Sequence, residues 1–251
     1  VENTPDERPS NSASVIDGNN QYNPIVINNT LGISAEVDRL VLYNSYDRGI
    51  HKTGGGDLSV ISCTFLTNGV HGTKNQGNGK GISITSASGA HVFVTNTLFM
   101  GNMLIDEVYD GSTGQGNGSG IYIDSGASLT VVDCRFNGNG HPSVTPSTSH
   151  SGNPRSGTFS GGAIYSTVPT HISYSRFCGN RVIHETGGGG TVVLTSSANG
   201  STLKNCLFAA NQDTRNWSSN GTPVSDKGGA LVVSLGNAAY TVDIENCTFA
   251  Y

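Results

Sequence analysis

The sequence predicts an all-β protein folded as a single right-handed parallel β-helix with about six full rungs, and three observations predict it. A two-part phrase recurs six times, at intervals of about 31 to 41 residues. Within each copy, apolar and polar residues alternate, which is typical of a strand with one buried face. Glycine accounts for 35 of 251 residues and charged residues for only 12%, against norms of about 7% and 25%. A phrase repeated at a regular period indicates stacked units that bury one another.

The first part of the phrase is a run of small residues that ends in an aliphatic residue. Together with the residue two positions later, this aliphatic residue predicts a short strand with its apolar side chains facing inward. The aliphatic positions are Ile50, Ile82, Ile121, Ile164, Val192 and Leu231.

The second part of the phrase predicts two short strands separated by a bend. The second strand is centred on a phenylalanine, at Phe65, Phe99, Phe136, Phe177, Phe208 and Phe249. Three residues earlier stand Ser62, Asn96, Asp133, Tyr174, Asn205 and Asn246. Asn and Asp tolerate a left-handed backbone, so these positions predict the bend. Stacked copies would place phenylalanine on phenylalanine at about 4.8 Å.

An asparagine follows the phenylalanine by three residues in the first five copies, at Asn68, Asn102, Asn139, Asn180 and Asn211. We interpret it as a corner residue that bonds to the backbone between rungs. Nearly all length variation follows it, in residues 69–78, 103–117, 140–160, 181–188 and 212–227. These insertions leave the same corner, so they are predicted to line one edge of the rod. Loops on a rigid scaffold often carry function, which makes this edge the candidate working face.

Three aromatic residues in the insertions are candidate ligand- or partner-binding residues: Tyr109, Phe159 and Trp217. Exposed aromatic side chains stack on sugar rings or anchor a protein partner. The alternative is that each folds back and holds its own loop.

A second candidate surface is a lateral interface. On the outer side of the long strand lie Ile61, Phe93, Leu98, Val132 and Leu207. An apolar outer face indicates packing against another subunit. The alternative is that the N-terminal region of the chain covers it.

The chain divides into three segments. Residues 1–13 are polar and contain Pro5 and Pro9, so a flexible N-terminal tail is predicted. Residues 14–46 carry degenerate strands and are predicted to form an N-terminal cap, with a short helix over 34–40. Residues 47–251 are the β-helix repeats. The chain starts without a leader sequence and stops before the sixth expected asparagine, which indicates a processed or excised chain.

No catalytic, cofactor-binding or metal-binding residues are predicted. An enzyme that cleaves polysaccharide on a β-helix would need carboxylates at one outer position in neighbouring copies, and only Asp243 and Glu245 pair, in the last copy. We interpret Asp106, Glu107 and Asp110 as a solvated acidic loop, the histidines as surface residues and most of the five cysteines as buried free thiols. A net charge of −5 argues against nucleic acid as a partner. No apolar run is long enough for a membrane-spanning helix.

The two phrases resemble the repeats of the polymorphic outer-membrane protein family. The carrying residues are Gly-Gly-Ala-Ile at 161–164, Asn-Cys-x-Phe at 205–208 and 246–249, and the Phe-x-x-Asn spacing. The resemblance covers about residues 47–251. It implies a surface-exposed β-helical passenger of an autotransporter that acts as an adhesin.

We therefore expect a secreted or cell-surface protein without enzymatic activity, structural or adhesive in role. Self-association, head-to-tail or lateral, into filaments or a surface layer is one expected behaviour. A host or cell-surface receptor or a glycan is the other expected partner. The alternatives are a polysaccharide lyase or glycoside hydrolase and a non-catalytic carbohydrate-binding protein.

Overall fold

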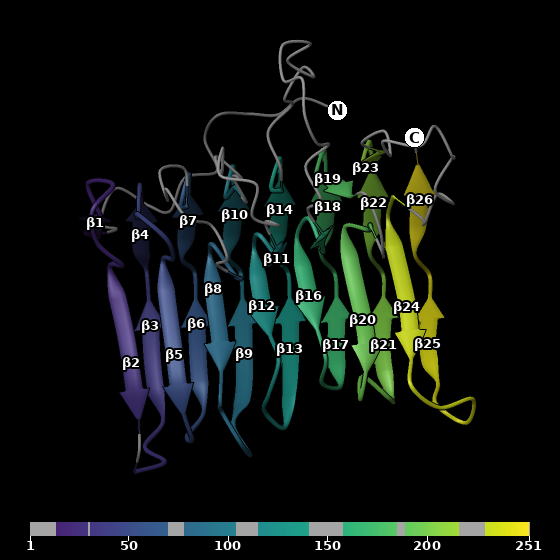
Figure 1. The fold of residues 1–251 in the computed structure, drawn as a ribbon, viewed down its shortest axis with the longest axis horizontal. Coiled ribbons are helices and arrows are strands. Elements are labelled where there is room, and N and C mark those ends of the chain that lie inside the picture. Colours follow the sequence, from purple (N-terminus) through teal and green to yellow (C-terminus); the bar gives the residue numbers. More distant parts are fainter. Residues whose placement is uncertain are drawn as a thin grey trace, which may run out of the picture.

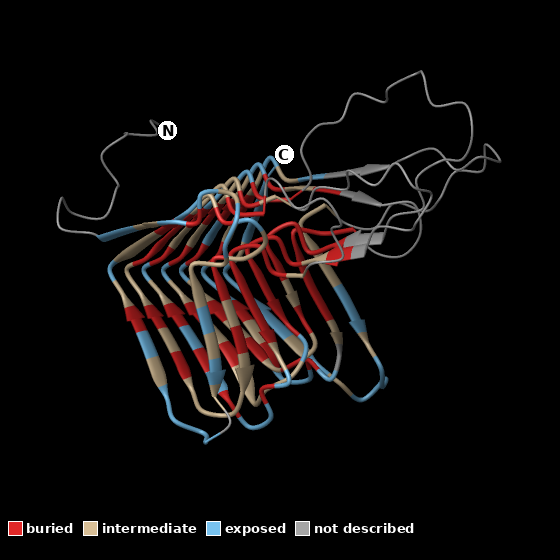
Figure 2. Ribbon diagram, turned by 60° about the vertical axis from the view of Figure 1, so that its left-hand side comes forward, coloured by how far each residue is buried: buried red, intermediate tan, exposed pale blue. Residues whose placement is uncertain are grey.

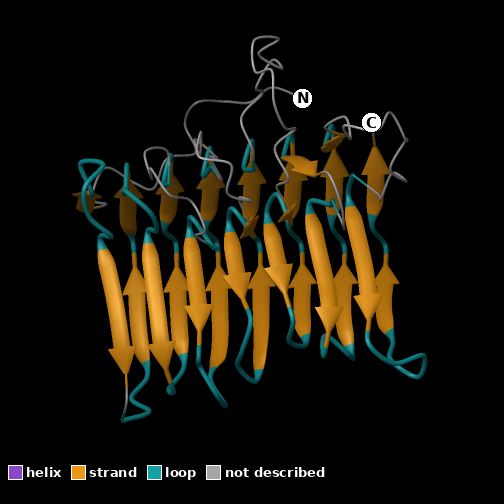
Figure 3. Cartoon of the chain, viewed as in Figure 1, coloured by secondary structure: helices purple, strands orange, loops and turns teal. Residues whose placement is uncertain are grey.

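A computed structural model describes residues 14–29, 31–69, 78–103, 115–140, 158–184, 189–215 and 229–250. These residues form strands and turns without a helix (Figure 3). Three long parallel sheets run side by side along the molecule, and each turn of the chain contributes one strand to each of them (Figure 1). The fold is the predicted right-handed parallel β-helix. The predicted tail, residues 1–13, lies outside the described residues.

We name the three long sheets A, B and C. Sheet B holds β2 (Ile25–Asn29) and the six strands that follow the runs of small residues: β5 (Ile50–Gly54), β8 (Ile82–Thr85), β12 (Ile121–Ile123), β16 (Ile164–Ser166), β20 (Val192–Ser196) and β24 (Leu231–Leu235). Sheet C holds the strands before the bend: β3 (Ala35–Asp38), β6 (Leu58–Ile61), β9 (His91–Thr95), β13 (Ser128–Val132), β17 (Thr170–Ser173), β21 (Ser201–Lys204) and β25 (Val242–Glu245). Sheet A holds β1 (Ser14–Asp17), β4 (Leu40–Tyr43) and the phenylalanine strands β7 (Thr64–Leu66), β10 (Leu98–Met100), β14 (Arg135–Asn137), β18 (Arg176–Cys178), β22 (Leu207–Ala209) and β26 (Thr248–Ala250).

The core is a set of stacked columns inside these sheets. Phenylalanine lies on phenylalanine in sheet A, as predicted. The centroids of the six successive rings are 4.7, 4.6, 4.8, 4.6 and 4.9 Å apart. Buried residues line the interior of the rungs from β3 to β22, and exposed residues lie on the outer faces and turns (Figure 2). Each rung is therefore buried chiefly by the rungs above and below it.

The bend between sheets C and A has the predicted backbone. All six predicted residues have a positive φ between 47° and 55°. The next residue points inward, and at Cys63, Cys134 and Cys206 its thiol is buried. All five cysteines are free, as predicted for most of them.

The helix predicted over residues 34–40 is wrong, because Ala35–Asp38 form strand β3. The strand pairs in parallel with β6, and Val37 is buried opposite Val60 while Glu36 and Asp38 point outward. A period of two therefore fits this segment better than a helical period. With β2 and β4, strand β3 completes one more rung in the same three sheets.

Candidate functional site

The corner where sheet A passes into sheet B is built around the repeated asparagines. The side-chain Nδ2 of Asn68 donates to Oδ1 of Asn102 at 2.9 Å, and the Asn68 backbone N–H donates to the same oxygen at 3.2 Å. The pattern repeats from Asn102 to Asn139, from Asn139 to Asn180 and from Asn180 to Asn211. The result is an asparagine ladder along the rod.

Each amide of this ladder also reaches back to the previous rung. Nδ2 of Asn139 donates to the Phe99 carbonyl oxygen at 2.9 Å, and Asn102, Asn180 and Asn211 make the equivalent bond at 2.8 to 3.0 Å. Asn139 is buried, so these bonds satisfy polar groups that water does not reach. The predicted corner role is confirmed.

The chain leaves the solenoid directly after the ladder. The backbone N–H groups of Met103, Gly140, Arg181 and Gln212 each donate to the carbonyl of the ladder asparagine one rung earlier, at 2.9 to 3.0 Å. The exits of the insertions are therefore stacked one above another, as predicted. A rigid row of amides fixes the place where each variable segment begins.

The described ends of the insertions form a fourth sheet, which the sequence did not predict. Sheet D contains β11 (Gln115–Asn117), β15 (Thr158–Ser160), β19 (Arg181–His184) and β23 (Gln212–Arg215). Strands β19 and β23 lie beside the upper ends of β18 and β22 in Figure 1. Strands β15 and β19 pair antiparallel at Thr158 and His184. The insertions thus begin or end in ordered backbone that widens this corner.

The lack of a side chain at Gly162 makes room for strand β19 of sheet D. A Cβ atom added to Gly162 would lie 3.1 Å from Cγ2 of Val182 in β19. Val182 is almost fully buried, so its side chain packs against the backbone at Gly162. The apolar pair Val182-Ile183, which follows a ladder asparagine, could have predicted strand β19.

The first insertion leaves beside a buried ion pair that sequence reasoning missed. The Lys80 side chain is fully buried, and its Nζ lies 2.7 Å from Oδ1 of Asp47. Arg48 lies 3.3 Å from the same carboxylate through Nε. Burial lowers the pKa of Lys80, and Asp47 partly opposes this shift. Charged residues stand where other copies of the phrase have small ones, at Asp47, Arg48 and Lys80. This substitution could have predicted the ion pair.

The predicted binding aromatics are not brought together in the described part of the chain. Tyr109 and Trp217 lie outside the described residues, as do the acidic residues 106, 107 and 110 and the histidines 71, 141 and 150. Phe159 has its backbone in β15, opposite Gly116 of β11, while its side chain lies outside the description. Their roles stay predictions.

The five residues of the predicted lateral interface do not form one strip. Ile61, Phe93 and Val132 lie in sheet C, whereas Leu98 and Leu207 lie in sheet A. Thr95 separates Ile61 from Val132 in register, and the rungs between Leu98 and Leu207 place arginines in that row. The bend after sheet C turns the second group onto another face. A role of either group in self-association stays a prediction.

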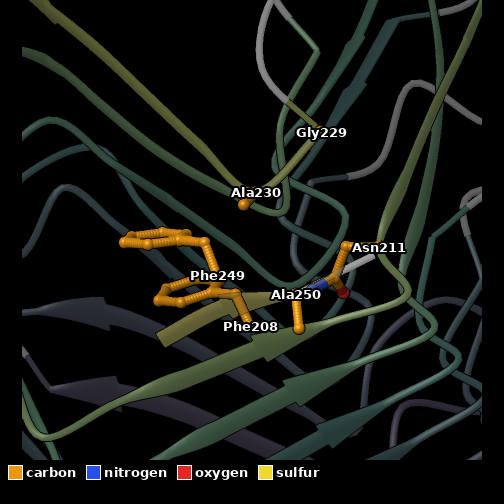
Figure 4. Close-up of a pocket in the computed structure, with 6 residues that line it drawn as sticks. All are labelled: Phe208, Asn211, Gly229, Ala230, Phe249 and Ala250. Carbon is orange, nitrogen blue, oxygen red and sulfur yellow. The ribbon is translucent and has the colours of Figure 1, made fainter. Parts of the chain in front are cut away.

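The C-terminal end of the column contains a hollow of about 260 Å³ (Figure 4). Phe208, Asn211, Gly229, Ala230, Phe249 and Ala250 line it. Phe249 is half exposed there. Its walls are the core column itself, and Asn211 is their one polar side chain.

Among the described residues, no group of three or more His, Cys, Asp or Glu side chains is placed to hold a metal ion. Within the same residues, no helix is long and apolar enough to cross a membrane. Comparison of the chain with protein-family models, curated proteins and solved structures found no match.

Proposed function

We propose that this chain is an extracellular, non-enzymatic protein of the cell surface whose β-helix is a scaffold for adhesive segments. The observation that carries the proposal is the stacked row of insertion exits on the asparagine ladder. The repeats conserve hydrogen bonds and packing at the corner, while the segments that leave it differ in length and composition. A constant framework that carries variable segments is typical of rigid scaffolds that present binding loops.

A binding assay with the purified chain tests this proposal. Fluorescently labelled chain is applied to a panel of cells and to a panel of immobilised glycans, and the same glycans are assayed for newly formed reducing and unsaturated ends. Saturable binding without release of such ends supports an adhesive role. Release of ends at a rate proportional to protein concentration would instead establish a polysaccharide-degrading enzyme and overturn the proposal.

Self-association is a second part of the proposal. Phe93 on the outer face of sheet C is 40% exposed, and an apolar side chain exposed on a sheet face favours lateral packing against another copy. Negative-stain electron microscopy over a range of concentrations tests it. Concentration-dependent filaments or sheets support assembly, whereas dispersed short rods at every concentration contradict it.

A further inference from the structure

A column of small polar side chains runs along the interior, directly after the bend between sheets C and A. Its members are Cys63, Thr97, Cys134, Ser175, Cys206 and Cys247. Thiols and hydroxyls alternate from Cys63 to Cys206, and the next rung then holds a second thiol in succession. Within this column, Cys206 and Cys247 are therefore the only thiols on neighbouring rungs.

These two cysteines are stacked in register. The residues that follow them, Leu207 of β22 and Thr248 of β26, are direct partners in a parallel pair, and the Thr248 backbone N–H donates to the Cys206 carbonyl oxygen at 2.8 Å. Neighbouring strands are about 4.8 Å apart, and a disulfide usually joins residues whose Cα atoms are about 4.4–6.8 Å apart. The backbone spacing at this point lies within the range that a disulfide spans.

The two thiol groups also lie close together. The Cys206 thiol donates to the Lys204 carbonyl oxygen at 3.3 Å. The Cys247 thiol donates to the Leu203 carbonyl oxygen at 3.5 Å, so it points back toward the rung that carries Cys206. Burial raises the pKa of the Cys206 thiol to about 11, and the neighbouring Cys247 thiol adds to this shift. Both observations place the two sulfur atoms next to each other in the column.

The other cysteines have no neighbouring thiol of this kind. One hydroxyl rung separates Cys63 from Cys134, and another separates Cys134 from Cys206. Two strand spacings amount to about 9.6 Å, which exceeds the reach of a disulfide. Cys178 lies on the outer side of β18, beside an inward-facing phenylalanine. The five cysteines therefore offer one intramolecular pair.

We propose that Cys206 and Cys247 form a reversible disulfide that cross-links the rung of β26 to the rung of β22. The oxidant is a low-molecular-weight disulfide. The Cys247 thiolate attacks one sulfur atom of this oxidant and releases the first small thiolate, and the Cys206 thiolate then attacks the Cys247 sulfur and releases the second. The oxidant accepts two electrons, and the two protons lost by the cysteines convert its halves into two small thiols.

The new bond closes a loop that spans residues 207–246. A cross-link of this kind restricts the unfolded chain, so the oxidised protein should unfold at a higher temperature than the reduced one. The inference depends on the positions of the two thiols and not on the proposed function. An adhesive chain can lack the disulfide, and a chain that binds no cell or glycan can contain it.

Counting thiols by mass spectrometry tests the proposal. The full chain is reduced, freed of reductant, incubated with oxidised glutathione at about pH 8.5, unfolded and alkylated with N-ethylmaleimide. The reduced chain should take up five maleimide groups, and the oxidised chain should take up two fewer. Trypsin cleaves after Lys204, Arg215 and Lys227, so peptides 205–215 and 228–251 should stay joined until reductant is added. A glutathione adduct on Cys178 is distinguished by its added mass.

Serine variants separate cross-linking from folding. Serine already occupies the equivalent buried position at Ser175, so Cys206→Ser should fold. Oxidation should raise the melting temperature of wild type by about 5 °C, and that of Cys134→Ser by as much, but should not change that of Cys206→Ser. Ser175→Cys fills the hydroxyl rung between two thiols, so its oxidation should remove four maleimide groups in place of two.

Three results would overturn the inference. The first is uptake of five maleimide groups by the chain after oxidation. The second is a disulfide between any other pair, including a dimer linked through Cys178. The third is an equal rise in melting temperature on oxidation for wild type and Cys206→Ser.

Discussion

Replacement of one ladder asparagine should destabilise the whole rod. In Asn139→Ala, the Asn102 backbone N–H and one Asn102 Nδ2–H lose their acceptor, and the Phe99 carbonyl loses its side-chain donor. These groups are at a buried corner. Each buried polar group left without a partner costs about 1–3 kcal/mol. We expect the free energy of unfolding to fall by about 3–6 kcal/mol, allowing for some relaxation.

Urea unfolding followed by circular dichroism measures this loss. The matched control is Asn137→Ala, two residues earlier, because the Asn137 side chain points outward from β14 and is half-buried. The control should cost less than about 1 kcal/mol. Equal losses in the two variants would refute the view that the ladder, and not asparagine content, stabilises the corner.

A second variant, Asn139→Asp, tests the ladder through the pH dependence of the free energy of unfolding. The aspartate replaces two donated hydrogen bonds with a carboxylate that faces the Phe99 carbonyl and the Asn180 Oδ1. Acceptors that face a carboxylate favour its protonated form, so the pKa of this aspartate should rise above its ordinary value. A group whose pKa is raised on folding contributes stability below its unfolded pKa and loses it as pH rises. The variant should therefore be more stable at pH 4 than at pH 7, relative to wild type.

Three further predictions concern the core and the buried ion pair. Gly81→Ala should cost about 1–3 kcal/mol in thermal unfolding, because the new Cβ would lie 2.4 Å from the Gly120 carbonyl oxygen, whereas Ala163→Gly at the equivalent position should cost under about 1 kcal/mol; similar costs would contradict the packing described here. Burial raises the pKa of the Cys134 thiol from 9.0 to about 12, so its stabilising contribution is complete below pH 9 and is lost between pH 9 and 12. Between pH 8 and 10.5 wild type should lose about 2 kcal/mol more than Cys134→Ala, and parallel pH profiles would contradict this. Asp47→Asn removes the carboxylate beside buried Lys80 and should cost about 1–3 kcal/mol at pH 7, less than for a fully buried pair, with a smaller cost near pH 10 where Lys80 is more readily neutral; a cost independent of pH would refute this reasoning.

The fold was predictable because every rung repeats the same physical solution. The phenylalanine spacing predicted the ring stack, and the Asn, Asp and Ser residues before it predicted the left-handed bends. The ladder corner and the common edge of the insertions followed from the asparagine spacing. Each of these features depends on local chemistry that recurs in every repeat. A repeat whose sequence is ambiguous can therefore be interpreted from the other repeats.

Features that occur only once were harder to predict. The segment 34–40 has one buried valine in a short strand, so its period was ambiguous without the neighbouring strand β6. Sheet D depends on pairing between segments of unequal length, which no period in the sequence reveals. The Lys80–Asp47 pair joins residues 33 apart through packing at the corner. The residues of the predicted lateral interface lie in two sheets, C and A, because the bend between these sheets separates them.

The most direct test of the account is a chain whose insertions are shortened while the ladder is kept. Residues 141–157 and 216–227 are each replaced by a short Gly-Ser linker, and the variant is compared with wild type in thermal unfolding and in cell-surface binding. The account predicts an unchanged cooperative unfolding transition together with a loss of binding of at least tenfold. Undiminished binding by the shortened chain would contradict it, because the scaffold itself, and not the insertions, would then carry the function.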